Sequence, residues 1–132
     1  MKKQITLFVS RAFLALIVLM AIGHAGTAHA LDKRTLNALK QMVPEEQLIQ
    51  RCELEAMDKL NAARIVAYTF EPLEYGDTKL KAPGAAYRKK GDWYRVSYSC
   101  TTSEDRMEVV QFSLKKGDKI PKQDWEQYNL FP

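Results

Sequence analysis

The spacing of apolar residues divides residues 31–132 into a helical first part and a strand-rich second part. Asp32 is suited to cap a short helix that carries Leu36, Leu39 and Val43 on one face. Because these three positions repeat at helical spacing, we expect that face to pack against the rest of the domain.

A second helix is predicted to begin at Pro44 and to run to about Ala63. Proline is favoured at the first position of a helix, and Glu45 and Glu46 would lie near the positive end of the helix dipole. Small and apolar residues recur along one stripe of this helix: Ile49, Cys52, Ala56, Leu60 and Ala63. Polar residues fall off the stripe and are expected to face solvent: Gln50, Glu53, Asp58 and Lys59.

After residue 63 the period of the pattern changes to two, and β-branched and aromatic residues become frequent. We expect strands at 65–70, 85–89, 93–101 and 107–114, with a further short piece at 78–81. Turns are predicted between them, one of them at Ala82-Pro83-Gly84. Helices followed by a run of strands indicate an α+β domain, in which two N-terminal helices pack on an antiparallel sheet of about four strands.

Residues 1–30 have the pattern of a secretory signal peptide, and residues 31–132 are expected to form a single mature domain. Basic residues at Lys2, Lys3 and Arg11 precede an apolar run of 11 residues, and the segment ends in Ala28-His29-Ala30. We expect cleavage after Ala30 and a periplasmic location. The rival interpretation is an uncleaved anchor, but a membrane-spanning helix needs about 20 apolar residues. We therefore expect no transmembrane helix after cleavage.

The charge balance changes once this leader is set aside. Three of the 20 basic residues lie in it and no acidic residue does, so 17 basic and 16 acidic residues remain. The sequence pI of about 9.1 therefore belongs to the precursor, and binding to nucleic acid is not expected. Both histidines also lie in the leader, at positions 24 and 29.

The two cysteines, Cys52 and Cys100, are expected to form a disulfide, because an oxidising compartment favours one in a small exported domain. Intermolecular pairing and free thiols are the alternatives. A disulfide would turn the Cys100 face of its strand toward the helices, and Tyr94, Val96 and Tyr98 would share that face. On the next strand, the residues expected to face the helices are Val110, Phe112 and Leu114, with Val109 on the opposite face.

The opposite face suggests a ligand surface built around Trp93. An indole beside hydrogen-bonding groups suits a sugar ring or a peptide. The candidate ligand face comprises Trp93, Arg95, Ser97 and Gln111, together with Ser99 and Ser113. In the alternative interpretation, the tail carrying Trp125 and Tyr128 folds over this face and turns Trp93 into a second core.

A local repeat, Lys-Lys-Gly-Asp at residues 89–92 and 115–118, suggests a second binding surface. Each copy is expected to close a strand at the same end of the sheet. The resulting basic rim would comprise Arg88, Lys89, Lys90, Lys115 and Lys116, with Lys119. Such a rim could contact anionic lipid headgroups or an acidic protein. The alternative is that lysines are ordinary residues at exposed hairpin ends.

Catalysis would have to rely on carboxylates. Without histidine, residues 31–132 cannot form a Ser-His-Asp or Cys-His arrangement or a histidine metal site, and a disulfide would remove thiolate chemistry. We assign no catalytic residue, metal or cofactor. The acidic residues of the second helix are expected to lie on a solvated face: Glu46, Glu53, Glu55 and Asp58.

Several stretches of the chain resemble the alphaproteobacterial family catalogued as domain of unknown function 930. They comprise residues 42–57, 66–68 and 82–88, the Trp93-Tyr94 pair, Cys100, Trp125 and residues 129–130. The resemblance implies an exported protein of alphaproteobacteria, many of them host-associated, and it implies no established activity. The family pattern has Asp before the proline at the start of the second helix, where this chain has Val43. We therefore expect no side-chain cap there.

These observations predict a periplasmic, disulfide-bridged domain that binds or supports another envelope component without catalysis. The expected partners are an envelope protein, peptidoglycan or anionic lipid. The alternative function is a small carboxylate-dependent hydrolase acting on cell-envelope glycans, which would need two acids close together in a concave site.

Overall fold

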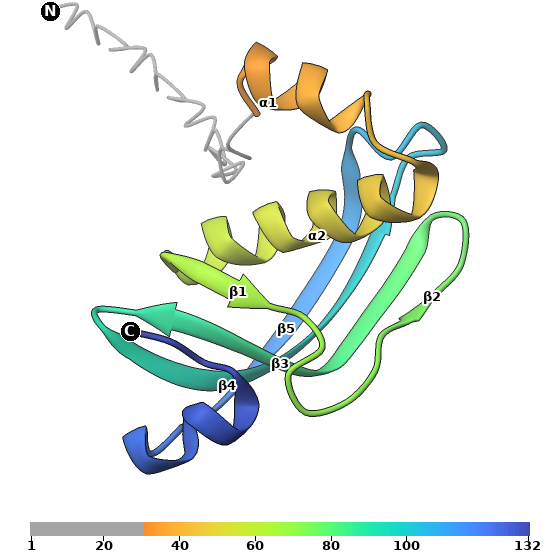
Figure 1. The fold of residues 1–132 in the computed structure, drawn as a ribbon. Helices are drawn as coiled ribbons and strands as arrows, with labels where there is room; N and C mark the ends of the chain where they lie inside the picture. The colour runs from red at the N-terminus through yellow and green to blue at the C-terminus, as the bar shows by residue number, and fades with distance from the viewer. Residues whose placement is uncertain (1–30) are drawn as a thin grey trace, which may run out of the picture.

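A computed structural model of the chain describes residues 31–132. The predicted signal peptide and its cleavage site at Ala30 lie outside these residues. The described part has two helices followed by strands that form one antiparallel sheet (Figure 1). The longer helix covers one face of the sheet, and the C-terminal tail returns beneath the other face (Figure 1).

The first helix, α1, spans Lys33–Leu39. As predicted, Asp32 caps it, because one oxygen of its carboxylate accepts hydrogen bonds from the backbone N–H groups of Arg34 and Thr35. Leu39 is buried, whereas Val43 lies beyond the end of the helix and is exposed. The predicted apolar face is therefore one residue shorter than expected.

The second helix, α2, spans Pro44–Leu60 and begins at the predicted proline. Val43 occupies the cap position and makes no side-chain hydrogen bond there. The helix ends before the predicted Ala63, because Asn61 adopts the left-handed conformation with φ of 48°. The backbone N–H groups of Asn61 and Ala62 then bond back to Asp58 and Met57, which is a typical helix termination motif.

The sheet has five strands rather than about four. They are β1 (Arg64–Val66), β2 (Glu74–Tyr75), β3 (Lys79–Lys89), β4 (Asp92–Thr102) and β5 (Val109–Lys119). Their order is β1-β3-β4-β5, and β2 also pairs with β3. The predicted strand at 65–70 is reduced to the three residues of β1, while the predicted pieces at 78–81 and 85–89 merge into one strand.

The merger corrects the prediction of a turn at Ala82-Pro83-Gly84. Ala82 pairs with Tyr98 and Ala85 with Val96, so β3 has one extra residue here and forms a bulge. Proline is tolerated because β1 and β2 pair with other parts of β3 and leave this stretch between them. The residues Ala82-Pro83-Gly84, which were expected to form a turn between two strands, therefore form a bulge within one strand.

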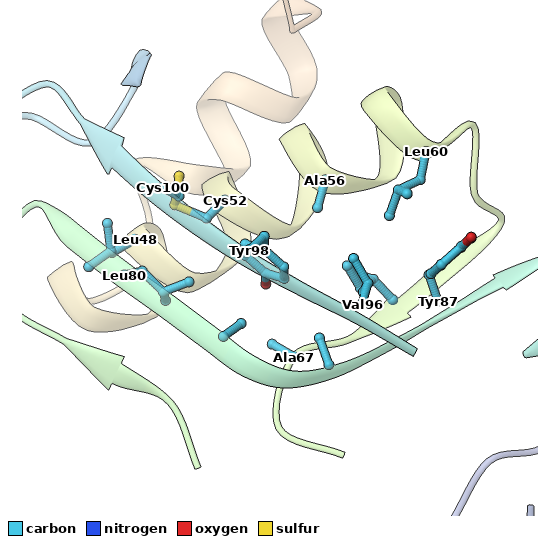
Figure 2. Close-up of a cluster of buried hydrophobic side chains, with 13 residues drawn as sticks. Leu48, Cys52, Ala56, Leu60, Ala67, Leu80, Tyr87, Val96, Tyr98 and Cys100 are labelled. Carbon is cyan, nitrogen blue, oxygen red and sulfur yellow. A yellow bond between two sulfur atoms is a disulfide. The ribbon is translucent and has the colours of Figure 1, made fainter. Parts of the chain in front are cut away.

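The main core lies between α2 and the sheet (Figure 2). Cys52 and Cys100 form the predicted disulfide within it, with their Cα atoms 5.9 Å apart. Val96 and Tyr98 are buried beside Cys100, which confirms the predicted phase of β4, while Tyr94 is half-buried at the border of the core.

The phase of β5 differs from the prediction at its first residues. Gln111 pairs with Thr101 and Val109 with Thr102, so Val110 is an extra residue in a second bulge. Consequently Val109 packs against the core, and Val110 is 64% exposed. Phe112 and Leu114 face the core as expected.

Candidate functional site

Trp93 is buried, so the prediction of an exposed indole at the ligand face is wrong. Only 1% of its surface is exposed, and its indole N–H donates a hydrogen bond of 3.0 Å to the backbone carbonyl of Phe131. The alternative interpretation, in which the tail covers this face, is confirmed. The second core comprises Ala86, Trp93, Ile120, Trp125 and Leu130, with Val66, Phe70 and Tyr128 packed against it.

The rest of the face opposite α2 carries two adjoining hollows, which we call the sheet groove. Both are lined by Pro83, Ser97 and Lys115, and they have volumes of about 230 and 310 Å³. Ser97 lies on β4 opposite Lys115 of β5, next to the bulge that contains Pro83. The bulge residue Pro83 therefore lies beside both hollows.

Four cationic residues line the sheet groove: Arg95, Lys115, Lys116 and Lys81. The guanidinium carbon of Arg95 lies 3.6 Å from the centroid of the Phe70 ring, so the ring supports a charged group that stays exposed. Within residues 31–132, neither Arg95 nor Lys115 has a carboxylate within 4 Å. Lys81, farther along the groove, pairs with Glu74 of β2 at 3.6 Å.

The rest of the polar lining comprises serine hydroxyl groups and the carboxylates of Glu71 and Glu74. Ser99 and Ser113 face each other on β4 and β5 and line the second hollow together with Ser97. Gln111 is exposed but pairs with Thr101 nearer the far end of the sheet, and it does not line the groove. The structure thus brings together Arg95 and Ser97 of the predicted ligand face, adds Lys115, and leaves out Trp93 and Gln111.

The predicted basic rim does not form, because its members are separated. Lys90 and Gly91, both with positive φ, make the tight turn between β3 and β4, whereas Lys115 and Lys116 lie inside β5. Lys116 pairs with Val96, which is three residues, or about 10 Å, along β4 from Trp93 at the base of that turn. The first copy of the Lys-Lys-Gly-Asp repeat therefore forms a turn between two strands, whereas the second copy lies within β5.

Two lysines near this turn already have partners. Lys89 donates a hydrogen bond of 2.8 Å to the carbonyl of Leu60, at the negative end of α2. Lys119 forms an ion pair of 2.8 Å with Asp92, which holds the pKa of the Asp92 carboxyl below its usual value. Arg88 alternates with Lys89 along β3, so it lies on the opposite face of the sheet.

One carboxylate of α2 that was predicted to face solvent is instead half-buried. Burial raises the pKa of Glu53 to about 7, although the backbone N–H of Ala67 favours the ionised form. Burial and the nearby Glu53 also raise the pKa of Tyr98, whose hydroxyl has no hydrogen-bond partner within residues 31–132. The other acids agree better with a solvated face, since Glu46 and Asp58 are exposed and Glu55 is paired with Arg51 and Lys59.

A separate hollow of about 370 Å³ lies at the start of α2. It is lined by Glu45, Tyr75, Asp77 and Arg106, and the Tyr75 hydroxyl donates a hydrogen bond to the Glu45 carboxylate. These residues come from three separate parts of the chain. Sequence analysis did not single them out, because no spacing links them before the chain has folded.

Metal and membrane features were also assessed over the described range. In residues 31–132, no group of three or more histidine, cysteine or acidic side chains is arranged to hold a metal ion. No helix of this part of the chain combines the length and the apolar character that crossing a bilayer requires.

The sequence signals of the sheet groove were present but ambiguous. Pro83 and Gly84 indicated irregular backbone, although they were assigned to a turn. Phe70 was placed at the end of a predicted strand, and nothing in the sequence showed that Arg95 would stack on it. Such a contact depends on how the loop after β1 returns to the sheet.

Comparison with known proteins identifies the family. The model of a family described as Domain of Unknown Function (DUF930) matches residues 39–130, which include α2, all five strands, both cysteines and Trp125. No curated protein and no solved structure matches the chain. The match covers most of the sequence and agrees with the resemblance seen in its motifs, and the chain therefore belongs to the DUF930 family.

Proposed function

We propose that the protein is exported to the periplasm and acts there as a non-catalytic binding module, with the sheet groove as its ligand surface. The observation that carries this proposal is the position of Arg95 and Lys115. Both border a concave surface, and neither has a carboxylate partner within residues 31–132. Cations held in this way favour an anionic ligand, because a bound carboxylate would supply the missing partner.

The shape and lining of the groove favour an extended chain that bears carboxylates. Hydroxyl groups of Ser97, Ser99 and Ser113 can donate hydrogen bonds to a peptide backbone or accept them from it. The hollows are shallow and lie end to end across three strands, which suits a chain better than a compact small molecule. Peptidoglycan fits this description, because its peptides carry free carboxylates.

Sedimentation with purified peptidoglycan tests the binding proposal. The oxidised protein should sediment with peptidoglycan at low salt and less so at high salt, since exposed charges are screened within about 8 Å at physiological ionic strength. The double variant Arg95→Ala/Lys115→Ala should lose most of this binding. Lys33→Ala/Arg34→Ala removes the same charge from the exposed surface of α1 and should bind normally.

Two other results would redirect the proposal. Binding to anionic lipid vesicles in place of peptidoglycan would show that peptidoglycan is not the ligand. Retention of peptidoglycan binding by Arg95→Ala/Lys115→Ala would show that the groove is not the binding surface. Export is tested separately, by sequencing the N-terminus of the protein recovered from the periplasm, where Leu31 is expected as the first residue.

The competing function is a carboxylate-dependent hydrolase, and the hollow at the start of α2 is its best location. Glu45 and Asp77 share that concave surface, which is the minimum such an enzyme requires. Release of soluble glycan fragments from peptidoglycan, lost in Glu45→Gln or Asp77→Asn, would establish this function. Unchanged peptidoglycan would leave the binding module as the better account.

A further inference from the structure

The sheet groove is closed at one end and open at the other. Arg95 lines only the first hollow, Ser97 lines both and Ser99 lines only the second, so the groove follows β4. Beyond Arg95 the same face of the sheet carries Trp93, which the C-terminal tail covers. Beyond Ser99, Gln111 pairs with the next residue of this face and is exposed. A chain lying in the groove can therefore continue past Ser99, whereas it must end near Arg95.

The wall at the closed end belongs to the second core. Trp93 packs there against Trp125 and Leu130 of the tail. The ring of Phe70 lies at the border, because its centroid is 4.6 Å from that of Tyr128 in the tail and it also contacts Arg95. Neither Trp93 nor any residue of the tail lines either hollow. The tail thus separates the groove from the rest of this face.

We propose that the sheet groove binds the free C-terminal carboxylate of a peptide at Arg95, with the peptide extending from there along Ser97 and Ser99. This role rests on the proposed function, and it specifies which group of the ligand is recognised and in which direction the ligand lies. The distance from Arg95 to Ser99 is about 13 Å along an extended strand. That length accommodates about four residues of an extended peptide.

The surroundings of Arg95 suit a carboxylate. Its guanidinium carbon lies 3.6 Å from the centroid of the Phe70 ring, which is van der Waals contact, so the ring covers one face of the guanidinium. The N–H groups of a guanidinium lie in its plane and can bind both oxygens of one carboxylate. Within residues 31–132, no carboxylate lies within 4 Å of this group. A ligand carboxylate would therefore meet donors that the ring already orients.

Gly117 allows Arg95 to occupy this position. It lies beside Arg95 on β5, where the register between β4 and β5 shifts. A Cβ atom added to Gly117 would lie 2.9 Å from the Cβ atom of Arg95, which is closer than non-bonded carbon atoms pack. A side chain at residue 117 would therefore require Arg95 to move. The glycine of the second Lys-Lys-Gly-Asp copy is thus a positioning residue for Arg95.

The charge of the first hollow also favours an anion. Three cationic residues and one carboxylate line it, an excess of two positive charges: Arg95, Lys115, Lys116 and Glu71. The second hollow shares Lys115, and its other cation, Lys81, is paired with Glu74 at 3.6 Å. A carboxylate is therefore favoured at the Arg95 end, and the serine hydroxyl groups suit the uncharged backbone that follows.

Short peptides with different ends test this recognition. N-acetylated tetra-alanine with a free C-terminal carboxylate should bind the oxidised protein about tenfold or more tightly than its C-terminal amide, since the amide loses a charge-assisted pair. An amidated peptide of the same length with one internal glutamate carries the same charge and should bind as weakly as the amide. Calorimetric titration measures the three affinities. C-terminal recognition would be overturned if the amide or the glutamate peptide bound as tightly as the free acid.

Two variants test the roles of Arg95 and Gly117 through the ratio of the two affinities, free acid over amide. Arg95→Lys keeps the charge but lacks the planar fork, so most of this preference should be lost. Gly117→Ala should reduce the same ratio by displacing Arg95. Gly76→Ala is the control, since its added atom has nothing within 4 Å, and it should keep the full preference. An unchanged ratio in Arg95→Lys would mean that Arg95 is not the receptor of the carboxylate.

A photoreactive group on the N-terminus of the free-acid peptide tests the direction. It should label the open end of the groove, near Ser99, Ser113 or Gln111. Labelling of Phe70 or of the tail would mean that the peptide lies the other way round, and the proposed direction would be wrong.

Peptide recognition and peptidoglycan binding can fail separately. If peptidoglycan binds through Arg95 and Lys115 but the free acid and the amide bind equally, the groove remains the ligand surface and C-terminal recognition is wrong. If the free acid is preferred and peptidoglycan does not bind, C-terminal recognition stands and peptidoglycan is not the ligand. If the protein binds neither the peptides nor peptidoglycan, both proposals are wrong.

Discussion

Glu53 shows how the surroundings of one residue can reverse its expected role. It lies off the apolar stripe of α2, yet the loop after β1 covers it and its pKa rises to about 7. An acid whose pKa is raised by folding keeps its proton up to a higher pH in the folded protein than in the unfolded chain. Its ionisation therefore opposes folding at high pH.

Glu53→Gln should make the protein more stable at high pH. Below the ordinary pKa of 4.5 the carboxyl is neutral in both states, and between pH 4.5 and about 7 stability should fall as pH rises. Above pH 7 the free energy of unfolding of Glu53→Gln should be higher than that of the parent protein, by at most about 3 kcal/mol. Urea denaturation at pH 4 and pH 8 measures this, with the exposed Glu46→Gln as the control.

Trp93 provides a second test at the level of one residue. It is almost fully enclosed by the tail, so Trp93→Ala should lower the free energy of unfolding by about 3 to 5 kcal/mol. Tyr68→Ala, at a residue that is 66% exposed, should change it by about 0.5 kcal/mol or less. If Trp93→Ala had the smaller effect, the tail would not cover the indole in solution.

The strand β3 shows that an element can depend on a close contact with a neighbouring loop. A Cβ atom added to Gly84 would lie 2.3 Å from the backbone nitrogen of Glu71, so the bulge accepts only glycine without movement. The backbone N–H of Phe70 also bonds to the carbonyl of Gly84 at 2.8 Å. Gly84 therefore holds the loop that supports Arg95 at the groove.

Gly84→Ala should cost about 1 to 3 kcal/mol of stability, because the backbone of Glu71 must shift to avoid the new methyl group. Gly76→Ala is the matched control, since nothing lies within 4 Å of the added atom there. Thermal unfolding of the two variants measures the difference. Equal unfolding temperatures would show that the loop after β1 does not pack on the bulge as described.

The disulfide links the two layers of the whole molecule. Cys52 lies in α2 and Cys100 in β4, so the bridge fixes the helix to the sheet. Closing a loop of this length, with a sequence separation of 48, is worth about 4 kcal/mol in the chain-entropy treatment. Typical domains have a total stability of only 5 to 15 kcal/mol.

Reduction of the disulfide should therefore lower the stability of the whole domain by several kcal/mol. Denaturation with and without reductant measures this loss, and mass spectrometry of the unreduced protein should find no thiol available for alkylation. Two alkylated thiols would mean that the bridge does not form in solution. An unchanged unfolding curve after reduction would mean that the bridge constrains little.

Local patterns predicted the parts of this molecule that depend on nearby residues. Asp32 and Pro44 determine helix starts within three residues of themselves, and the alternation through Val96, Tyr98 and Cys100 determines a face of one strand. The bulges at Pro83 and Val110 were missed, because an extra residue is defined only relative to the partner strand. The same limit explains why the basic rim was predicted wrongly and why the hollow at the start of α2 was not predicted.

The sequence by itself determined the helix starts, the succession of helices followed by strands, the disulfide partners and the family, because each is a property of residue type and spacing. Only the tertiary structure decided which surface remains open. The tail covers Trp93, Lys89 is used at the end of α2, and Lys115 joins Arg95 at the sheet groove. These outcomes depend on contacts between segments far apart in the chain, and such contacts leave no periodic signal in the sequence.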